Sequence, residues 1–215
     1  MSKIRSIISI IYCVLRRPED ILEAIQGKSV AANELGGGKN GIFGAKFIRN
    51  PGHIFMGTGS SIGNGANIWV HDSELHQGEF TPADGQERIV GQIIIGDNVR
   101  IGQNIKIDCY ERVEIEDNCL LASDICIIDS NHGTGIEKES YVETAGVRKP
   151  IRIGKGSWIG ERVCILAGAN IGEKCIIGTN AVVTGNIPDY SIAVGIPARV
   201  IKTYNMETGQ WEKVN

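Results

Sequence analysis

The chain has 215 residues, which is enough for one well-buried domain or for a domain with a small appendage. Hydrophobic residues make up 42% of it and charged residues 22%, the composition of a soluble globular protein. The formal net charge of −3 gives no general attraction to nucleic acid, so a protein that tracks a phosphate backbone is not expected. Glycine is abundant at 28 residues and isoleucine and valine are frequent, which favours short strands joined by tight turns.

The first 40 residues predict a helical segment, with the helix over residues 1–30 and a glycine-rich stretch after it. The apolar part of this helix, Ile7–Leu15, is too short to span a bilayer, which takes about 20 residues. No small-residue cleavage site follows, so a signal peptide is not expected. The helix either packs on the body of the protein or lies on a membrane surface, with Arg5, Arg16 and Arg17 near lipid head groups.

None of the six cysteines forms a CxxC pair, and several occupy positions where a small core residue is expected: Cys13, Cys109, Cys119, Cys126, Cys164 and Cys175. We interpret them as reduced, buried thiols, which predicts a cytosolic protein. Disulfides are the alternative.

A spacing of six residues between large aliphatic side chains organises most of the remaining chain. The longest run in one phase consists of Ile153, Ile159, Ile165, Ile171, Ile177 and Val183. Glycine follows most of these residues, and a smaller residue precedes several of them by two positions, as Val163 precedes Ile165. The same spacing occurs upstream in Ile95, Ile101 and Ile107, then after a slip of two residues in Ile115, Leu121 and Ile127, and more weakly from Met56 to Ile68.

A period of six is neither that of a helix nor that of a lone strand. It predicts a β-solenoid in which each hexad is a short strand plus a turn and three hexads close a triangular coil. The large aliphatic residue and the smaller one before it point inward, while Gly and Asn form the turns. Neighbouring coils then stabilise one another in series. Six consecutive hexads in phase argue against a chance spacing in a β-sandwich.

Two polar interruptions divide the repeat, at residues 71–92 and 129–150. Long loops on a regular scaffold usually carry function, because the scaffold uses its side chains for packing. The second interruption contains His132 between Asn131 and Gly133, which allow close approach of backbone and ligand.

The hexads and the ending TGNIPDYSIAVGIPARVIK, residues 184–202, resemble the hexapeptide-repeat acyltransferases, and within them the bacterial sugar and polysaccharide O-acetyltransferases. The resemblance is continuous over roughly residues 95–205, weaker over 42–70, and absent from 1–40 and 71–92. It implies an all-β protein with a left-handed parallel β-helix over residues 41–203, a short N-terminal helix and a C-terminal tail at 204–215. It also implies acetyl-CoA as acyl donor, a sugar or oligosaccharide acceptor, and a homotrimer with active sites in clefts between subunits.

The stretch ASDICIIDSNHG aligns without gaps with the catalytic stretch of these enzymes and places His132 on their catalytic histidine. A neutral imidazole suits the removal of a proton from a hydroxyl near neutral pH, so His132 is expected to act as general base. The alternative is a histidine that caps a turn. Asp129 is expected to orient the imidazole or bind a sugar hydroxyl, together with Asn131, or else to start the loop as an Asx turn.

The resemblance also places a cofactor groove. Backbone N–H groups in the turn Trp158-Ile159-Gly160-Glu161 are expected to stabilise the oxyanion, with Trp158 near the thioester arm. Glu161 stands where relatives carry a serine, so a hydroxyl contact is not expected. The remaining positions are Gly178 and Thr179 for the pantetheine arm, and Thr184, Arg199 and Lys202 for the nucleotide phosphates. Gly185 replaces a lysine of several relatives. Outer-face packing for Trp158 and ordinary surface charge for Arg199 and Lys202 are the alternatives.

The acceptor positions of the galactoside acetyltransferases do not carry over, because this chain has Gly102 and Cys109-Tyr110 where those enzymes have Asn and Asp. A different sugar is therefore expected. Asn104, Asp108 and Tyr110 are candidates for the lip of its pocket, or serve their turns alone.

A zinc site is weighed because His71 and His76 have a spacing found in hexapeptide carbonic anhydrases. No third ligand is well placed, so we expect no metal. The sequence predicts an acetyl-CoA-dependent O-acetyltransferase for a bacterial surface-polysaccharide sugar or its precursor, with direct attack in a ternary complex and His132 as base. The alternatives are N-acetylation of an amino sugar, a zinc hydratase and an inactive scaffold.

Overall fold

The computed structural model of the chain describes residues 41–42, 45–72, 90–144 and 146–214. The predicted helix over residues 1–30, Cys13, and most of the first interruption, including His76, lie outside the described residues. Among the described helices, none is long and apolar enough to cross a membrane.

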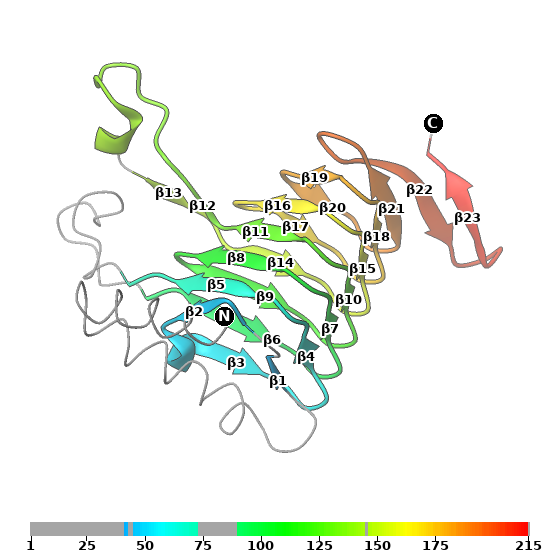
Figure 1. The fold of residues 1–215 in the computed structure, drawn as a ribbon. Coiled ribbons are helices and arrows are strands. Elements are labelled where there is room, and N and C mark those ends of the chain that lie inside the picture. The colour runs from blue at the N-terminus through cyan, green and yellow to red at the C-terminus, as the bar shows by residue number, and fades with distance from the viewer. Residues whose placement is uncertain (1–40, 43–44, 73–89, 145, 215) are drawn as a thin grey trace, which may run out of the picture.

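The chain winds as a parallel β-helix built from three sheets, here named A, B and C (Figure 1). Sheet A contains the parallel strands β1 (Gly41–Ile42), β4 (Ser61–Ile62), β7 (Arg100–Ile101), β10 (Leu120–Leu121), β15 (Trp158–Ile159), β18 (Ile176–Ile177) and β21 (Ser191–Val194). Sheet B contains β2 (Phe47–Arg49), β5 (Asn67–Val70), β8 (Lys106–Cys109), β11 (Cys126–Ile128), β16 (Cys164–Leu166) and β19 (Val182–Val183). Sheet C contains β3 (Ile54–Met56), β6 (Gln92–Ile95), β9 (Arg112–Ile115), β14 (Ile151–Ile153), β17 (Asn170–Ile171) and β20 (Asn186–Ile187).

The chain passes through the sheets in the order A, B, C and repeats, so each coil takes one strand from each sheet. Three edges result: the A–B edge, the B–C edge and the C–A edge. A short 3-10 helix, η1 (Pro51–His53), forms the B–C edge of the first coil. All-β architecture with parallel sheets, as the hexads predict, is confirmed.

The core is a set of aliphatic ladders that run along the coil axis. In sheet B, Ile68, Ile107, Ile127 and Ile165 are partners in successive strands, and each is 0% exposed. The predicted smaller residues, such as Ala169, are also buried. Full burial of one such aliphatic side chain stabilises the fold by about 1.5–3 kcal/mol, so the repeat accounts for most of the cohesion between coils.

Left-handed backbone turns close the edges. At the A–B edge Asn104, Asp124 and Asn180 have φ of 56°, 59° and 61°, as the prediction of Asn in turns requires. Arg162 occupies the equivalent position with φ 56°, although arginine adopts a left-handed backbone conformation less readily than Asn or Asp. Gly65 shows why a small residue is needed in the first of these turns: a Cβ there would lie 2.3 Å from Asn104 Oδ1.

The C-terminus extends sheet A instead of leaving it. After β21 the chain reverses into β22 (Arg199–Asn205) and β23 (Gln210–Lys213), which pair antiparallel (Figure 1). The boundary expected between the β-helix and the C-terminal tail, at residues 203/204, therefore falls inside β22. Trp211 packs edge-on against Tyr204 of the same hairpin, with ring centroids 5.3 Å apart.

The five described cysteines are free thiols. Cys109, Cys119 and Cys175 are buried, as predicted, and burial raises the pKa of the Cys109 thiol. The prediction of burial is wrong for Cys126 and Cys164, which are half-buried neighbours in β11 and β16. Their neighbours in sequence, Ile127 and Ile165, take the inward positions, so strand alternation turns both cysteines outward.

Candidate active site

Both interruptions of the repeat fall between a strand of sheet B and the following strand of sheet C, at the B–C edge. The first lies between β5 and β6, and the second lies between β11 and β14, two coils later. In the intervening coil, Tyr110 and Glu111 form the B–C corner and account for the slip of two residues after Ile107. The B–C edge is therefore where this chain departs from the hexad rule.

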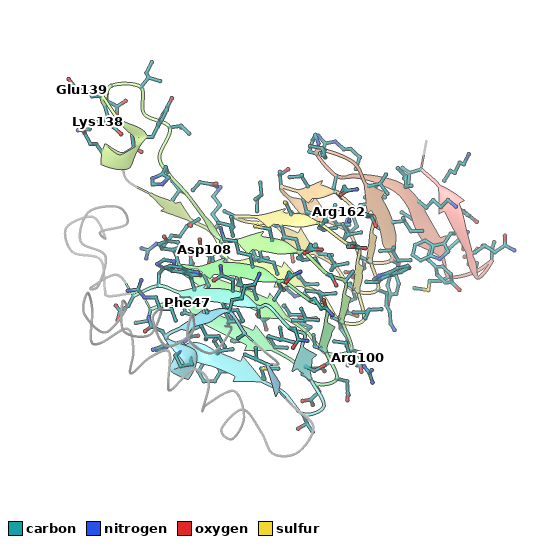
Figure 2. All side chains as sticks on the ribbon, viewed as in Figure 1. Phe47, Arg100, Asp108, Lys138, Glu139 and Arg162 are labelled. Atoms are coloured by element: carbon teal, nitrogen blue, oxygen red, sulfur yellow. The ribbon has the colours of Figure 1, made fainter. Side chains whose placement is uncertain are left out.

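The second interruption forms an arm that stands away from the body, with Lys138 and Glu139 at its far end (Figure 2). Its base is a short antiparallel pair, β12 (Ser130–Asn131) with β13 (Val147–Arg148), and it carries the 3-10 helix η2 (Tyr141–Glu143). Thr144 Oγ1 donates to the carbonyl of Gly133 at 2.9 Å and closes the loop near its base. His132 directly follows β12 and is exposed. The arm thus presents the predicted base outside the prism.

Asp129 fastens the arm to the preceding coil. Its side chain is fully buried, and its carboxylate accepts the backbone N–H groups of Tyr110, Glu111 and Arg112 at 2.7, 2.8 and 2.9 Å. Burial raises the pKa of this carboxyl, and the N–H groups and the Cys109 thiol act in the opposite direction. Of the roles weighed for Asp129, these contacts favour the one that stabilises the start of the loop.

The predicted pantetheine and oxyanion residues lie on a different edge. Gly160 and Glu161 follow β15, and Gly178 and Thr179 follow β18, so all four line the A–B edge. The Gly160 N–H donates to Ile177 O at 2.8 Å, whereas the Glu161 N–H has no hydrogen bond to the part of the chain that the structure describes. Of these two N–H groups, the Gly160 N–H is already engaged within the coil.

The remaining predicted cofactor residues are spread over two places. Thr184 follows β19 and lies at the B–C edge, on the same side as His132. Trp158 lies on the outer face of sheet A and is 50% exposed, and Arg199 and Lys202 belong to β22 at the end of that sheet. Arg199 is exposed, and Lys202 pairs with Ile192 of β21 in register.

A cavity of about 430 Å³ lies between sheet A and the C-terminal hairpin. Trp158, Tyr190, Tyr204 and Trp211 give it an aromatic lining, Met206 adds an apolar thioether, and Lys174 adds a cation. Trp158 begins β15, directly after the C–A turn, and Gly156 and Lys174 of the C–A turns line the same cavity.

The proposed pocket-lip residues also divide between the edges. Asn104 lies in an A–B turn, where its Nδ2 donates to Asp124 Oδ1 at 3.1 Å, so a turn role explains it. Asp108 and Tyr110 lie in sheet B and at the B–C edge, close to the start of the arm. One chain therefore holds His132, Asn131, Tyr110 and Thr184 along one edge and the groove residues along another, with sheet B between them.

Sequence reasoning missed the partners of Asp108. Its Oδ1 accepts a hydrogen bond from His71 Nε2 at 2.6 Å, and the imidazole stacks on Tyr110 with centroids 3.7 Å apart and planes at 5°. His71 was weighed only as a zinc ligand. Over the described residues no three His, Cys, Asp or Glu side chains are grouped as a metal site needs. Only the pairing of β5 with β8 brings these residues together, and the sequence gives no direct sign of that register.

Comparison with known proteins gives three informative matches. Residues 150–185 match the family model described as bacterial transferase hexapeptide, six repeats. The chain is 33% identical over 175 residues to the Escherichia coli K12 protein WbbJ, whose name describes O-acetyl transfer in lipopolysaccharide biosynthesis, and the match covers 78% of this chain and 80% of WbbJ. It is 34% identical over 164 residues, 75% of its length, to Mycobacterium tuberculosis H37Rv Rv3034c, which is named as an acetyltransferase, but it spans only about half of that relative, 52%.

Among solved structures, a galactoside acetyltransferase in complex with coenzyme A superposes with a TM-score of 0.53 at 27% identity. The superposition covers 77% of this chain and 74% of the other.

Proposed function

The chain belongs to the bacterial hexapeptide transferase family, and on that basis we propose that it is an acetyl-CoA-dependent O-acetyltransferase with a sugar hydroxyl as acceptor. The observation that carries the proposal is the position of His132. His132 is exposed and lies at the base of the arm, directly after β12. The arm is an insertion that interrupts an otherwise regular coil.

His132 takes the proton of the acceptor hydroxyl while the hydroxyl oxygen attacks the thioester carbonyl carbon. The tetrahedral oxyanion is stabilised by the Glu161 N–H, a contribution of about 3–4 kcal/mol where such a donor is well aligned. Collapse breaks the C–S bond, and the imidazolium returns its proton to the departing thiolate of coenzyme A. The attack is direct, in a ternary complex, because the residues flanking His132, Asn131 and Gly133, carry no nucleophilic side chain for an acyl-enzyme.

Coenzyme A is held by Trp158, Gly178 and Thr179 along its pantetheine arm and by Thr184, Arg199 and Lys202 at its phosphates. The solved galactoside acetyltransferase in complex with coenzyme A supports coenzyme A as the ligand. The coil is left-handed, as in that family. The acceptor is a sugar of a bacterial surface polysaccharide or its precursor, since WbbJ is named for lipopolysaccharide biosynthesis.

The active site is completed between protomers of a homotrimer. His132 and the A–B groove lie on two edges with sheet B between them, so the B–C edge of one protomer must face the A–B edge of the next for acyl donor and base to meet. A cyclic trimer provides this contact three times.

Mass spectrometry of products from a panel of hydroxyl and amino sugars tests the reaction. An added acetyl group on a hydroxyl acceptor, with consumption of acetyl-CoA, is expected. Acetylation of amino acceptors alone would instead establish an N-acetyltransferase.

Mixing two inactive variants tests the shared site. Refolding His132→Ala together with Thr179→Trp, which blocks the groove, restores about a quarter of the sites if base and groove come from different protomers. No recovery on mixing would place the whole site in one chain.

A further inference from the structure

The acceptor has to approach His132 from the side that the acyl donor leaves open. The residues assigned to the oxyanion and to coenzyme A, among them Gly160, Gly178 and Thr184, all lie on coils that follow the arm along the axis. The coils that precede the arm, formed by strands β1 to β9, are the ones left for the acceptor.

An aromatic cluster lies on sheet B in these earlier coils, formed by Phe47, Trp69, His71 and Tyr110. The Phe47 and Trp69 centroids are 4.6 Å apart, those of Trp69 and His71 are 6.1 Å apart, and His71 stacks on Tyr110. His71 is buried, whereas the other three rings are partly exposed. Because the rings stack on one another, the cluster offers an apolar row of ring edges on the outer face of a sheet whose inner face is already filled by isoleucine.

A carboxylate borders this apolar surface. Asp108 is the register partner of Trp69 in β8, and its side chain is 24% exposed. Its Oδ1 is held by His71, and Oδ2 makes no hydrogen bond within the described parts of the chain. Asp108 and Phe47 lie on the side of the body from which the arm leaves (Figure 2). The cluster thus has a fixed, charged acceptor at its edge.

The cluster is coupled to the arm through the backbone. Tyr110 stacks on His71, and its N–H donates to Asp129, which is three residues from His132. A ligand on the cluster would accordingly lie next to the root of the arm that carries the base.

We propose that the aromatic cluster and Asp108 form the acceptor subsite, and that its occupant is an oligosaccharide of at least two pyranose rings. The proposal rests on the proposed acetyl transfer to a sugar. The cluster extends over three neighbouring strands, β2, β5 and β8, which is about 10 Å across a sheet and longer than one pyranose ring. The C–H groups of the sugars pack on the outward edges of the stacked rings, and a hydroxyl donates to Asp108.

The test uses the full chain on an array of bacterial surface saccharides of one to four residues, with acetyl-CoA affinity measured on the same samples. Wild type is expected to be retained by saccharides of two or more residues. Trp69→Ala and Asp108→Asn are expected to weaken this retention by about tenfold or more, as removal of an aromatic contact or a charge-assisted hydrogen bond implies. The matched control is Phe55→Ala, because Phe55 belongs to the same early coils but lies on sheet C and is 50% exposed.

Equal retention of wild type and both variants overturns the subsite, as does retention of monosaccharides alone. Binding of acetyl-CoA without retention of any saccharide also overturns the subsite and leaves the donor chemistry intact. Failure of wild type to bind acetyl-CoA would instead refute the proposed function and the subsite with it. Unchanged acetyl-CoA affinity in the two variants distinguishes a lost subsite from a misfolded protein.

Discussion

The A–B and B–C edges border the same sheet but are built differently. At the A–B edge, the turns holding Asn104, Asp124, Arg162 and Asn180 are short and left-handed. At the B–C edge, two long insertions and the two-residue corner at Tyr110 interrupt the same repeat. Sheet B nevertheless stays in register through both insertions. The core therefore constrains the inward residues and leaves corners free to carry added segments.

The two edges also use hydrogen bonds differently. A–B turns are linked by side chains to one another, as Arg162 Nε donates to Asn180 Oδ1 at 2.9 Å and Asn104 donates to Asp124. At the B–C edge the buried Asp129 takes three backbone N–H groups of the neighbouring coil. The A–B edge is thus held by repeated contacts between side chains of successive turns. At the B–C edge, a single buried residue, Asp129, binds the start of the arm to the neighbouring coil.

The largest effect is expected from the residue that the B–C edge presents. His132→Ala should lower kcat by about 10²–10⁴-fold, because the general base is lost. Stability should hold, since His132 is exposed. Acetyl-CoA turnover with an accepted saccharide measures this, and His53→Ala on η1, at the same edge, is the matched control. A His132→Ala variant as active as wild type would leave the arm without a catalytic role.

The next effect tests whether the arm disturbs the core. Ile127 lies just before the arm and Ile165 lies in the following coil, and both are 0% exposed. Each substitution to Ala should lower the free energy of unfolding by about 2–5 kcal/mol. If insertions leave the core unaffected, the two losses agree within about 0.5 kcal/mol.

Urea unfolding at one protein concentration measures both losses. Ile94→Ala, on the outer face of sheet C, is the control and should cost much less. A markedly smaller loss at Ile127 would mean that the coil is loosened where the arm leaves.

A smaller effect is expected at the anchor of the arm. Asp129→Asn replaces one acceptor oxygen by an N–H₂ group that faces backbone donors, so the free energy of unfolding should fall by about 1–3 kcal/mol. Displacement of the arm should also lower kcat by up to about 10²-fold. The control is Asp124→Asn in an A–B turn, which keeps an acceptor for Asn104. A change in stability with an unaltered kcat would separate Asp129 from the position of His132.

The regular half of this comparison could be predicted from the sequence. Ile153, Ile159 and Ile165 are six residues apart and are buried, because the period of a coil depends only on neighbours along the chain. The location of His132 in a break followed from the same rule, since a residue that does not fit the hexad must lie outside the prism.

The irregular half could not be predicted to the same depth. The contact between His71 and Asp108 joins residues 37 apart and depends on the register of β5 against β8 and on an insertion of unrepeated sequence between them. The buried position of Asp129 depends equally on the corner at Tyr110, where the hexad slips. Alternation in NIWVHD does place Trp69 and His71 on one face, which was the available sign of the aromatic cluster.

The smallest effect concerns the A–B ladder itself. Arg162 adopts φ 56°, while the equivalent residues Asn104, Asp124 and Asn180 are types that tolerate a left-handed turn. Arg162→Asn should therefore raise the free energy of unfolding by up to about 1 kcal/mol, reduced by the loss of the exposed contacts to Glu161 and Asn180. Arg100→Asn, in strand β7, is the control and should give no gain. An equal decrease in the free energy of unfolding for both variants would mean that the arginine side chain, and not the backbone conformation, determines the stability of this turn. Side-chain contacts between successive turns would then be what stabilises the A–B edge.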